Sequence, residues 1–183
     1  MNRKYKLPYK VSCIAYVATS IDGKIAKNSQ SDTDWTSKED WNFFQKSLSK
    51  MDAVVVGRNT YQLAKARLDQ RNAIVLSSKV NSPKLRGKTT FLNPDKTDLK
   101  KFLQTKDYRN VAIVGGAKVY DYCLRHKILD ELYVTIEPYV FTAGVPMFSG
   151  SEFKKHRFTL VSVKRLNQVG TILLKYKNES YRA

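Results

Sequence analysis

Glycine, hydroxyl and basic side chains occur together directly after several apolar runs of this sequence. Gly57, Arg58 and Thr60 follow one such run. Glycine lets a ligand approach the backbone closely, threonine offers a hydroxyl donor, and the planar guanidinium of arginine matches two phosphate oxygens. A tight turn with a solvated arginine explains this string equally well when it is taken alone. Its chemistry is nevertheless that of a phosphate-binding turn.

Two later stretches repeat this chemistry. Residues 77–79 (SSK) place two hydroxyls beside an ammonium group after a second apolar run. Gly115 and Gly116 follow a third run, with Lys118 close behind, and suit a pyrophosphate that lies across a helix N-terminus. Turn-forming serines, and glycines that permit close packing of a strand and a helix, are the structural alternatives. The dinucleotide fingerprint G-x-G-x-x-G is absent from the sequence.

A fourth polar stretch, residues 19–25 (TSIDGKI), follows the first apolar run. Asp22 and Gly23 form a turn signal within it, and a lone aspartate in a turn is usually structural. In open α/β sheets, ligands bind beyond the carboxyl ends of the strands, so all four stretches would meet at one edge of the sheet. Together they predict a site for an extended, phosphate-rich ligand.

The hydrophobic pattern indicates the elements that must position these groups. Short apolar runs rich in Val and Ile predict strands buried on both faces, and amphipathic spacing predicts helices between them. The predicted strands in this part of the chain are residues 11–19, 53–57, 73–76, 90–92 and 110–116. The predicted helices are residues 36–49, 59–68 and 98–103 and a segment containing residues 119–124. Such alternation predicts an α/β protein with a mostly parallel sheet and helices on both faces.

The pattern changes toward the C-terminus. Residues 132–138 predict a strand, and residues 139–152 predict a loop that contains glycine and proline. Two alternating runs, 158–166 and 170–177, predict a hairpin. We expect this hairpin to add antiparallel strands at one edge of the sheet.

The bulk composition limits the class of protein. The chain has 33 Lys and Arg against 16 Asp and Glu, and this net charge of +17 is spread along the sequence. It attracts anionic ligands without identifying them. No apolar run has the length of a signal peptide or a membrane span, and Cys13 and Cys123 lie inside apolar stretches, as buried free thiols do. We expect one cytoplasmic domain over residues 1–183, with its core at about 11–178.

Several segments resemble known reductases. VVVGRNTY (54–61), IVLSS (74–78) and IVGGAKVYDYCL (113–124) resemble, in order and spacing, the NADPH-binding segments of dihydrofolate reductases. ATSIDGKIA (18–26) and ILDELYVTIEPYV (128–140) are more similar to the reductase domain of the riboflavin-pathway deaminase–reductase, the RibD C-terminal domain family. Both families belong to one superfamily. The resemblance implies a dihydrofolate-reductase-like three-layer sandwich with a C-terminal antiparallel hairpin.

The resemblance also implies NADPH as the cofactor. Arg58 and Ser78 would contact the adenosine 2′-phosphate, and Thr60 with the amides of Gly115 and Gly116 would hold the pyrophosphate. The remaining residues of the implied cofactor site would flank these phosphates or the nicotinamide. They are Ala18, Ile25, Gly57, Ser77, Lys79, Lys118 and Tyr120.

The substrate residues transfer less directly. The residues implied by the riboflavin-pathway enzymes are Lys24, Asp34, Trp35, Thr36, Thr135 and Glu137, with Asp22 as the candidate for orienting a ribose or assisting proton transfer. Turn, cap and edge-strand roles are the alternatives. Dihydrofolate reductases place an acidic residue in the first helix to grip the pterin. Here residues 36–39 predict a capping box, which explains Glu39 and Asp40 without a pterin.

We therefore expect an NADPH-dependent reductase that acts on a ribosylaminopyrimidine phosphate and forms a homodimer. A pterin or other small electrophile is the alternative acceptor. His126 and His156 are isolated and no H-x-E or P-C-x-x-C signature occurs, so no metal site is expected. A basic nucleic-acid-binding protein is the alternative of another class, although no recognition motif supports it and no nucleic-acid or membrane partner is expected.

Overall fold

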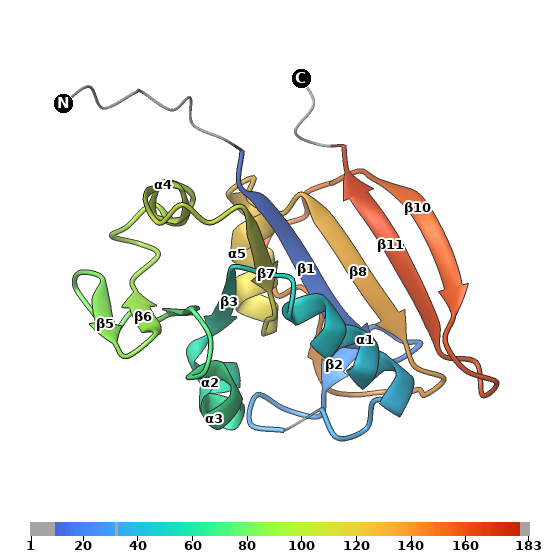
Figure 1. Cartoon of the computed structure of the whole chain (residues 1–183). Coiled ribbons are helices and arrows are strands. Elements are labelled where there is room, and N and C mark those ends of the chain that lie inside the picture. The colour runs from blue at the N-terminus through green and yellow to red at the C-terminus, as the bar shows by residue number, and fades with distance from the viewer. Residues whose placement is uncertain (1–9, 32, 180–183) are drawn as a thin grey trace.

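The computed structural model of the chain describes residues 10–31 and 33–179 and arranges them around one central sheet (Figure 1). In spatial order its nine strands are β10 (Phe158–Arg165), β11 (Ile172–Asn178), β8 (Glu131–Ile136), β1 (Ser12–Thr19), β7 (Asn110–Ile113), β3 (Ala53–Gly57), β4 (Ala73–Leu76), β6 (Thr89–Leu92) and β5 (Lys84–Arg86). The strands from β8 to β6 pair in parallel. Strands β11 and β10 on one side, and β5 on the other, pair antiparallel with their neighbours.

Helices cover both faces of the sheet and enclose a separate apolar core on each. Helices α1 (Lys38–Leu48), α2 (Arg58–Leu63) and α3 (Lys65–Leu68) pack on one face, where Leu48, Tyr61 and Leu68 contact Val54 and Val56. Helices α4 (Leu99–Thr105) and α5 (Ala117–Arg125) pack on the other face against the opposite side chains of the same strands. This arrangement confirms the predicted three-layer α/β architecture and the C-terminal antiparallel hairpin.

The strands are buried on both faces because helices lie above and below them. In β3, residues 53–56 are at most 1% exposed, which matches their continuous apolar sequence. Cys13 and Cys123 are buried free thiols, as predicted. Burial raises the pKa of Cys13 to about 12, so that thiol stays protonated and inert.

Several boundaries differ from the sequence-based prediction. The predicted helix 59–68 is two short helices, since the chain leaves helical geometry at Ala64. The predicted loops contain three further strands, β2 (Lys24–Ala26), β9 (Val145–Pro146) and β5. These strands are two or three residues long and form by pairing with a distant or turn-connected partner. Segments this short have no periodic hydrophobic pattern, so the sequence did not predict them.

The pairing of β2 with β9 fastens the loop after β1 to the loop after β8. Gly144 makes this close approach possible: its φ is 135°, and a Cβ there would lie 2.5 Å from the carbonyl oxygen of Ala26. Any side chain would therefore clash with backbone. The two loops close one side of the C-terminal edge of the sheet, where the predicted ligand residues lie.

Candidate active site

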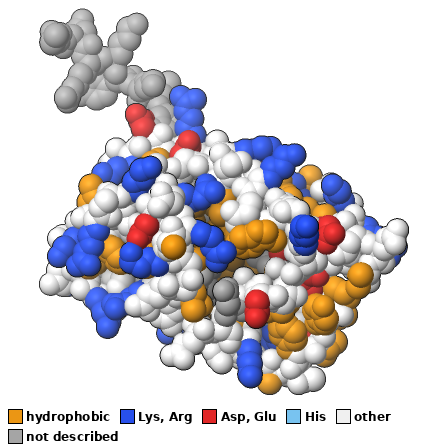
Figure 2. All heavy atoms as spheres, turned by 60° about the horizontal axis from the view of Figure 1, so that its bottom comes forward, with side chains coloured by type: hydrophobic (Ala, Val, Ile, Leu, Met, Phe, Trp, Pro, Cys, Tyr) orange, Lys and Arg blue, Asp and Glu red, His pale blue; other side chains and the backbone are white. Residues whose placement is uncertain are grey.

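One large cavity, of about 810 Å³, lies at the carboxyl ends of β1, β3, β4 and β7. We call the part lined by the N-terminal turns of α2 and α5 the α5 end, and the part lined by α1 and β8 the α1 end. Figure 2 turns this edge of the sheet toward the viewer and shows lysine and arginine side chains spread over it. All twelve residues predicted to contact a cofactor line the cavity. Parallel strands bring them together because their carboxyl ends share one edge.

Backbone contacts shape the α5 end. The amide of Gly57, at the end of β3, donates a hydrogen bond of 2.7 Å to the carbonyl of Gly115, beyond β7. A Cβ on Gly57 would lie 3.1 Å from Val119 of α5. The two strand ends therefore approach closely, and they place Arg58 and Thr60 of α2 opposite the first turn of α5.

Gly116 is the N-cap of α5 and lines the cavity. A Cβ built on Gly116 would meet the Thr60 hydroxyl at 3.5 Å, an ordinary contact, so the backbone here is open to the cavity. The preceding residue, Gly115, has φ of 95° and packs against the Tyr120 ring. The open helix N-terminus and the Thr60 hydroxyl form a cradle of hydrogen-bond donors that fits a pyrophosphate.

Beyond β4, the three residues of the SSK stretch differ in exposure. Ser77 is buried, and its Oγ accepts a hydrogen bond from the amide of Lys79 at 3.2 Å, so this serine stabilises the turn. Ser78 and Lys79 are exposed and line the cavity. Together with Arg58 they provide a hydroxyl, an ammonium and a guanidinium, a donor set that fits a phosphate monoester.

Tyr120 lines the middle of the cavity from α5 but is only 3% exposed. Its hydroxyl donates a hydrogen bond of 2.6 Å to the backbone carbonyl of Tyr16 in β1. Burial, with a smaller effect of Cys123 and Asp40, raises the pKa of Tyr120 well above the ordinary range. The hydroxyl therefore stays neutral, and it fixes α5 against β1 at the centre of the cavity.

Asp40 is the main acidic group of the α1 end. It lies in the first turn of α1, is 8% exposed, and lines the cavity together with Thr36 and Thr135. Burial raises its pKa, and the nearby Glu137 carboxylate raises it further, while hydrogen bonds with Thr135 and Thr36 oppose the shift. A buried carboxyl with a raised pKa, in a cavity, can hold a proton for a ligand.

The capping box predicted over residues 36–39 begins one residue later, and capping does not account for the Asp40 side chain. Ser37, not Thr36, is the N-cap of α1, and its Oγ accepts a hydrogen bond of 3.2 Å from the amide of Asp40. The cap thus engages the backbone amide of Asp40, whereas its carboxyl is hydrogen-bonded with Thr135 and Thr36, which line the cavity with it. The first helix does carry an acidic residue in the site.

Asp22 lies on the outside of the turn after β1 and is not among the residues that line the cavity in the described part of the chain. Its Oδ1 accepts hydrogen bonds from the Ser20 hydroxyl at 2.6 Å and from the amide of Phe141 at 3.0 Å. These hydrogen bonds, that from Ser20 first, lower the pKa of Asp22. Lys24 also lies outside the lining. In this structure the Asp22 carboxylate fastens two loops together.

Of the other predicted substrate residues, some line the cavity and some do not. Thr36 and Thr135 line the α1 end, whereas Asp34 and Trp35 do not. Trp35 packs edge-on against Phe141, and its buried indole N–H has no hydrogen-bond partner within the described chain.

Glu137 is 1% exposed and lies outside the cavity lining. Its carboxylate accepts hydrogen bonds from the amide of Ser37 at 2.7 Å and the hydroxyl of Thr171 at 2.6 Å. Both oxygens are therefore engaged within the protein, where they join β8 to the N-terminus of α1 and to the turn before β11.

The sequence matches the RibD C-terminal domain family over residues 12–172, most of its length. The chain belongs to this family. Its members are NADPH-dependent reductases of small molecules. Among the described residues, no helix is long and apolar enough to cross a bilayer.

Individual proteins are similar to this chain in sequence or in fold. The uncharacterised protein YwjB of Bacillus subtilis is 27% identical over 143 residues, which cover 74% of this chain and 81% of YwjB. A Thermotoga maritima diaminohydroxyphosphoribosylaminopyrimidine deaminase/5-amino-6-(5-phosphoribosylamino)uracil reductase has a TM-score of 0.69 at 19% identity, over 92% of this chain and 57% of that one. Enterococcus faecalis dihydrofolate reductase, complexed with NADP(H), has a TM-score of 0.64 at 22% identity, over 94% of this chain and 99% of that one. These structures show that the RibD C-terminal domain chain has a dihydrofolate-reductase-like fold.

In this RibD C-terminal domain member, an aromatic cluster that the sequence did not predict also lines the α1 end. Tyr16 of β1 stacks on Tyr133 of β8, with ring centroids 5.2 Å apart, and Phe43 and Phe44 of α1 pack beside them. At the same end the Arg67 guanidinium of α3 lies 4.9 Å from the ring centroid of Trp41 in α1. The amphipathic spacing of residues 41, 44 and 48 indicated a buried helix face, but it could not show that this face borders a cavity.

Proposed function

We propose that the protein is an NADPH-dependent reductase of a small heterocyclic substrate. One observation supports this proposal above the others: a single cavity joins a phosphate-binding α5 end to an α1 end that contains a buried carboxyl. A dinucleotide needs the first, because its charge lies on phosphates. A substrate that gains a proton during reduction needs the second.

The α5 end would bind the cofactor through backbone groups and side chains that follow the strand ends. Thr60 and the α5 N-terminus at Gly116 would hold the pyrophosphate, and Arg58, Ser78 and Lys79 would hold the 2′-phosphate. Bound NADPH would supply the hydride, so the protein itself needs no redox group. The net charge of +17 raises the local concentration of this anionic cofactor.

The α1 end would hold and protonate the substrate. The Asp40 carboxyl, hydrogen-bonded with Thr135, would face the edge of a heterocycle that offers N–H donors. The Tyr16, Phe43 and Phe44 rings would exclude water from the reduced atom. Asp40 would hold a proton in its neutral form and donate it as the ring or its ribosyl carbon is reduced.

A ribosylaminopyrimidine phosphate is the substrate that the family suggests. Its pyrimidine edge suits Asp40, and its phosphate suits the two arginines that line the same end, Arg67 and Arg71. In this reaction the ribose becomes a ribityl chain, which consumes one hydride and one proton. A homodimer and a cytoplasmic location remain predictions.

A dihydropterin is the second candidate, and the position of Asp40 favours it. From the sequence, the acidic residues of the first helix were assigned to capping rather than to a pterin. In the structure Asp40 of this helix lines the cavity and is hydrogen-bonded with Thr135. A carboxylate pairs well with the adjacent amino and ring N–H groups of a pterin. The anionic tail of a folate would suit Arg67 and Arg71 equally.

The deciding experiment measures NADPH oxidation at 340 nm with the purified protein and each substrate in turn. Turnover with the ribosylaminopyrimidine phosphate supports the first assignment, and turnover only with dihydrofolate replaces it with the second. Tritium transfer from labelled NADPH into the product confirms hydride transfer. Failure to bind NADPH at physiological salt would overturn the reductase proposal as a whole.

A further inference from the structure

The segment 58–71, which we call the wall, supplies lining residues to both ends of the cavity. Arg58 and Thr60 lie at the α5 end, and Leu63, Ala64 and Arg67 continue the same lining toward α1. These residues belong to α2 and α3, which are joined at Ala64. Any shift of this wall would move the predicted cofactor and substrate contacts together.

The two helices cannot hold this position by themselves. Helix α2 has six residues and α3 has four, and neither has a side-chain cap at its N-terminus. Helices this short are unstable in isolation, because nucleation costs more than so few hydrogen bonds return. The position of the wall must therefore come from contacts with the rest of the protein.

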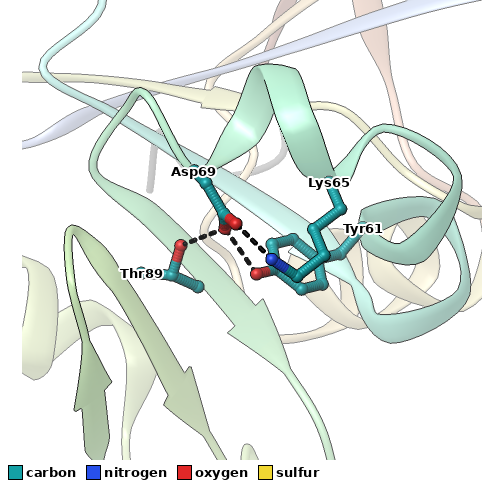
Figure 3. Close-up of polar contacts among 4 residues, drawn as sticks. All are labelled: Tyr61, Lys65, Asp69 and Thr89. Carbon is teal, nitrogen blue, oxygen red and sulfur yellow. Dashed lines mark hydrogen bonds and ion pairs between the residues drawn. The ribbon is translucent and has the colours of Figure 1, made fainter.

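Asp69, the residue that ends α3, provides a set of such contacts (Figure 3). Its Oδ1 accepts a hydrogen bond of 2.5 Å from the Tyr61 hydroxyl of α2 and one of 3.1 Å from the Thr89 hydroxyl of β6. Its Oδ2 pairs with the ammonium group of Lys65. One carboxylate thus joins both short helices to the sheet.

The donors around Asp69 are mostly buried. Tyr61 is 6% exposed and packs edge-on against Phe91 of β6, with ring centroids 5.6 Å apart, and Thr89 is 1% exposed. The hydrogen bonds from Lys65 and Tyr61 hold the pKa of Asp69 below its ordinary value, so the carboxylate is a charged acceptor at neutral pH. Removing it would leave two buried hydroxyls without their acceptor, and such groups are costly to leave unpaired.

The residues that contact Asp69 and the residues that line the cavity alternate along the wall and do not overlap. Tyr61 and Lys65, one helical turn apart, face Asp69, whereas Thr60 and Ala64, each one residue earlier, line the cavity. We propose that Asp69 is a positioning residue, which fixes the wall so that Arg58 meets the 2′-phosphate of NADPH. This inference rests on the proposed cofactor and adds a residue that never touches it.

The test is a double-mutant cycle on NADPH affinity, measured by quenching of protein fluorescence. Asp69→Ala is expected to raise the NADPH dissociation constant about tenfold, and Tyr61→Phe about threefold, because Arg58 loses its alignment. In an Arg58→Ala background the same substitutions should raise the NADPH dissociation constant by a clearly smaller factor, since only the Thr60 contact of the wall then remains to be displaced. A role in stability alone would give the same fold-change in both backgrounds.

Two controls separate positioning from general destabilisation. Lys65→Met removes the exposed ion pair but keeps both buried hydroxyl donors, so it should weaken NADPH less than Asp69→Ala does. Leu103→Val, in α4 and outside the cavity lining, should lower the unfolding midpoint without altering NADPH affinity. If Asp69→Ala does not fold, the double-mutant cycle is measured with Asp69→Asn and Tyr61→Phe instead. Equal effects with and without Arg58 would overturn this inference alone, whereas a wild-type protein that fails to bind NADPH would overturn it together with the proposed function.

Discussion

The two ends of the cavity are built in different ways. The α5 end is made of backbone groups and side chains that directly follow β3, β4 and β7, so each contact lies within a few residues of a strand end. The α1 end is made of side chains from α1, β1 and β8, which are far apart in the sequence and meet only in the folded chain. The first construction suits a ligand of fixed shape. The second can change its substrate by exchanging a few side chains.

The largest effect should come from filling the α5 end. Gly116→Val is expected to abolish NADPH binding, because its side chain would occupy the cradle at the start of α5. The φ of Gly116 is −75°, and a Cβ makes only an ordinary contact with Thr60, so the variant should fold. Isothermal titration with NADPH measures the loss, and circular dichroism checks the fold. The smaller Gly116→Ala should weaken binding less, and full affinity in the valine variant would contradict the cradle.

The difference between the two ends explains what the sequence could predict. The strands and the residues after them were predicted because apolar runs and the glycines or hydroxyls that follow them are local signals. Asp40 was missed because a capping role explained its position in α1, and only its contact with Thr135 of β8 reveals the cavity. Glu137 was assigned to the substrate because it shares a strand face with Thr135, but Thr171 and the α1 N-terminus engage its carboxylate.

The next largest effect should come from the α1 end. Asp40→Asn is expected to lower kcat by about 100-fold or more, the usual contribution of a general acid, with little change in NADPH affinity. Since the pKa of Asp40 is raised, wild-type kcat should fall as pH rises through that pKa, when the proton is lost. The asparagine variant should lack this limb of the pH profile. Stopped-flow measurement of NADPH oxidation over a range of pH tests the loss of kcat and the change in its pH dependence. An unchanged pH profile would show that Asp40 does not transfer the proton.

Asp40→Asn, which should lower kcat, should at the same time raise the stability of the folded protein at pH values above the pKa of Asp40. A raised pKa means that folded Asp40 binds its proton more tightly than unfolded Asp40, so the free energy of unfolding falls as pH rises through the raised value. Above that value the ionised carboxylate costs stability, so Asp40→Asn should raise the unfolding midpoint there. A lower midpoint for the variant at the alkaline end of a thermal unfolding series would show that the charge is well solvated.

A smaller and more selective effect should come from the phosphate contacts. Arg58→Ala should weaken NADPH by about 1.5–3 kcal/mol, the loss of one charge-assisted contact, and should weaken NADH much less. Arg67→Ala is the matched control, because this arginine lies on the same wall but at the α1 end, next to Trp41. It should raise the KM of the substrate and leave both dinucleotide affinities unchanged. Equal losses of NADPH and NADH in Arg58→Ala would rule out the 2′-phosphate contact.

The smallest effect on catalysis should come from Asp22, although the sequence offered it as the catalytic carboxylate. Asp22→Asn keeps an oxygen that can accept hydrogen bonds from Ser20 and the amide of Phe141, and it changes a group that lies outside the cavity lining. We therefore expect kcat/KM to change by less than about twofold, within the range of surface substitutions. Steady-state assays of Asp22→Asn beside Asp40→Asn compare the two carboxyls directly. A large loss with Asp22→Asn and a small one with Asp40→Asn would return the proton-transfer role to the loop after β1.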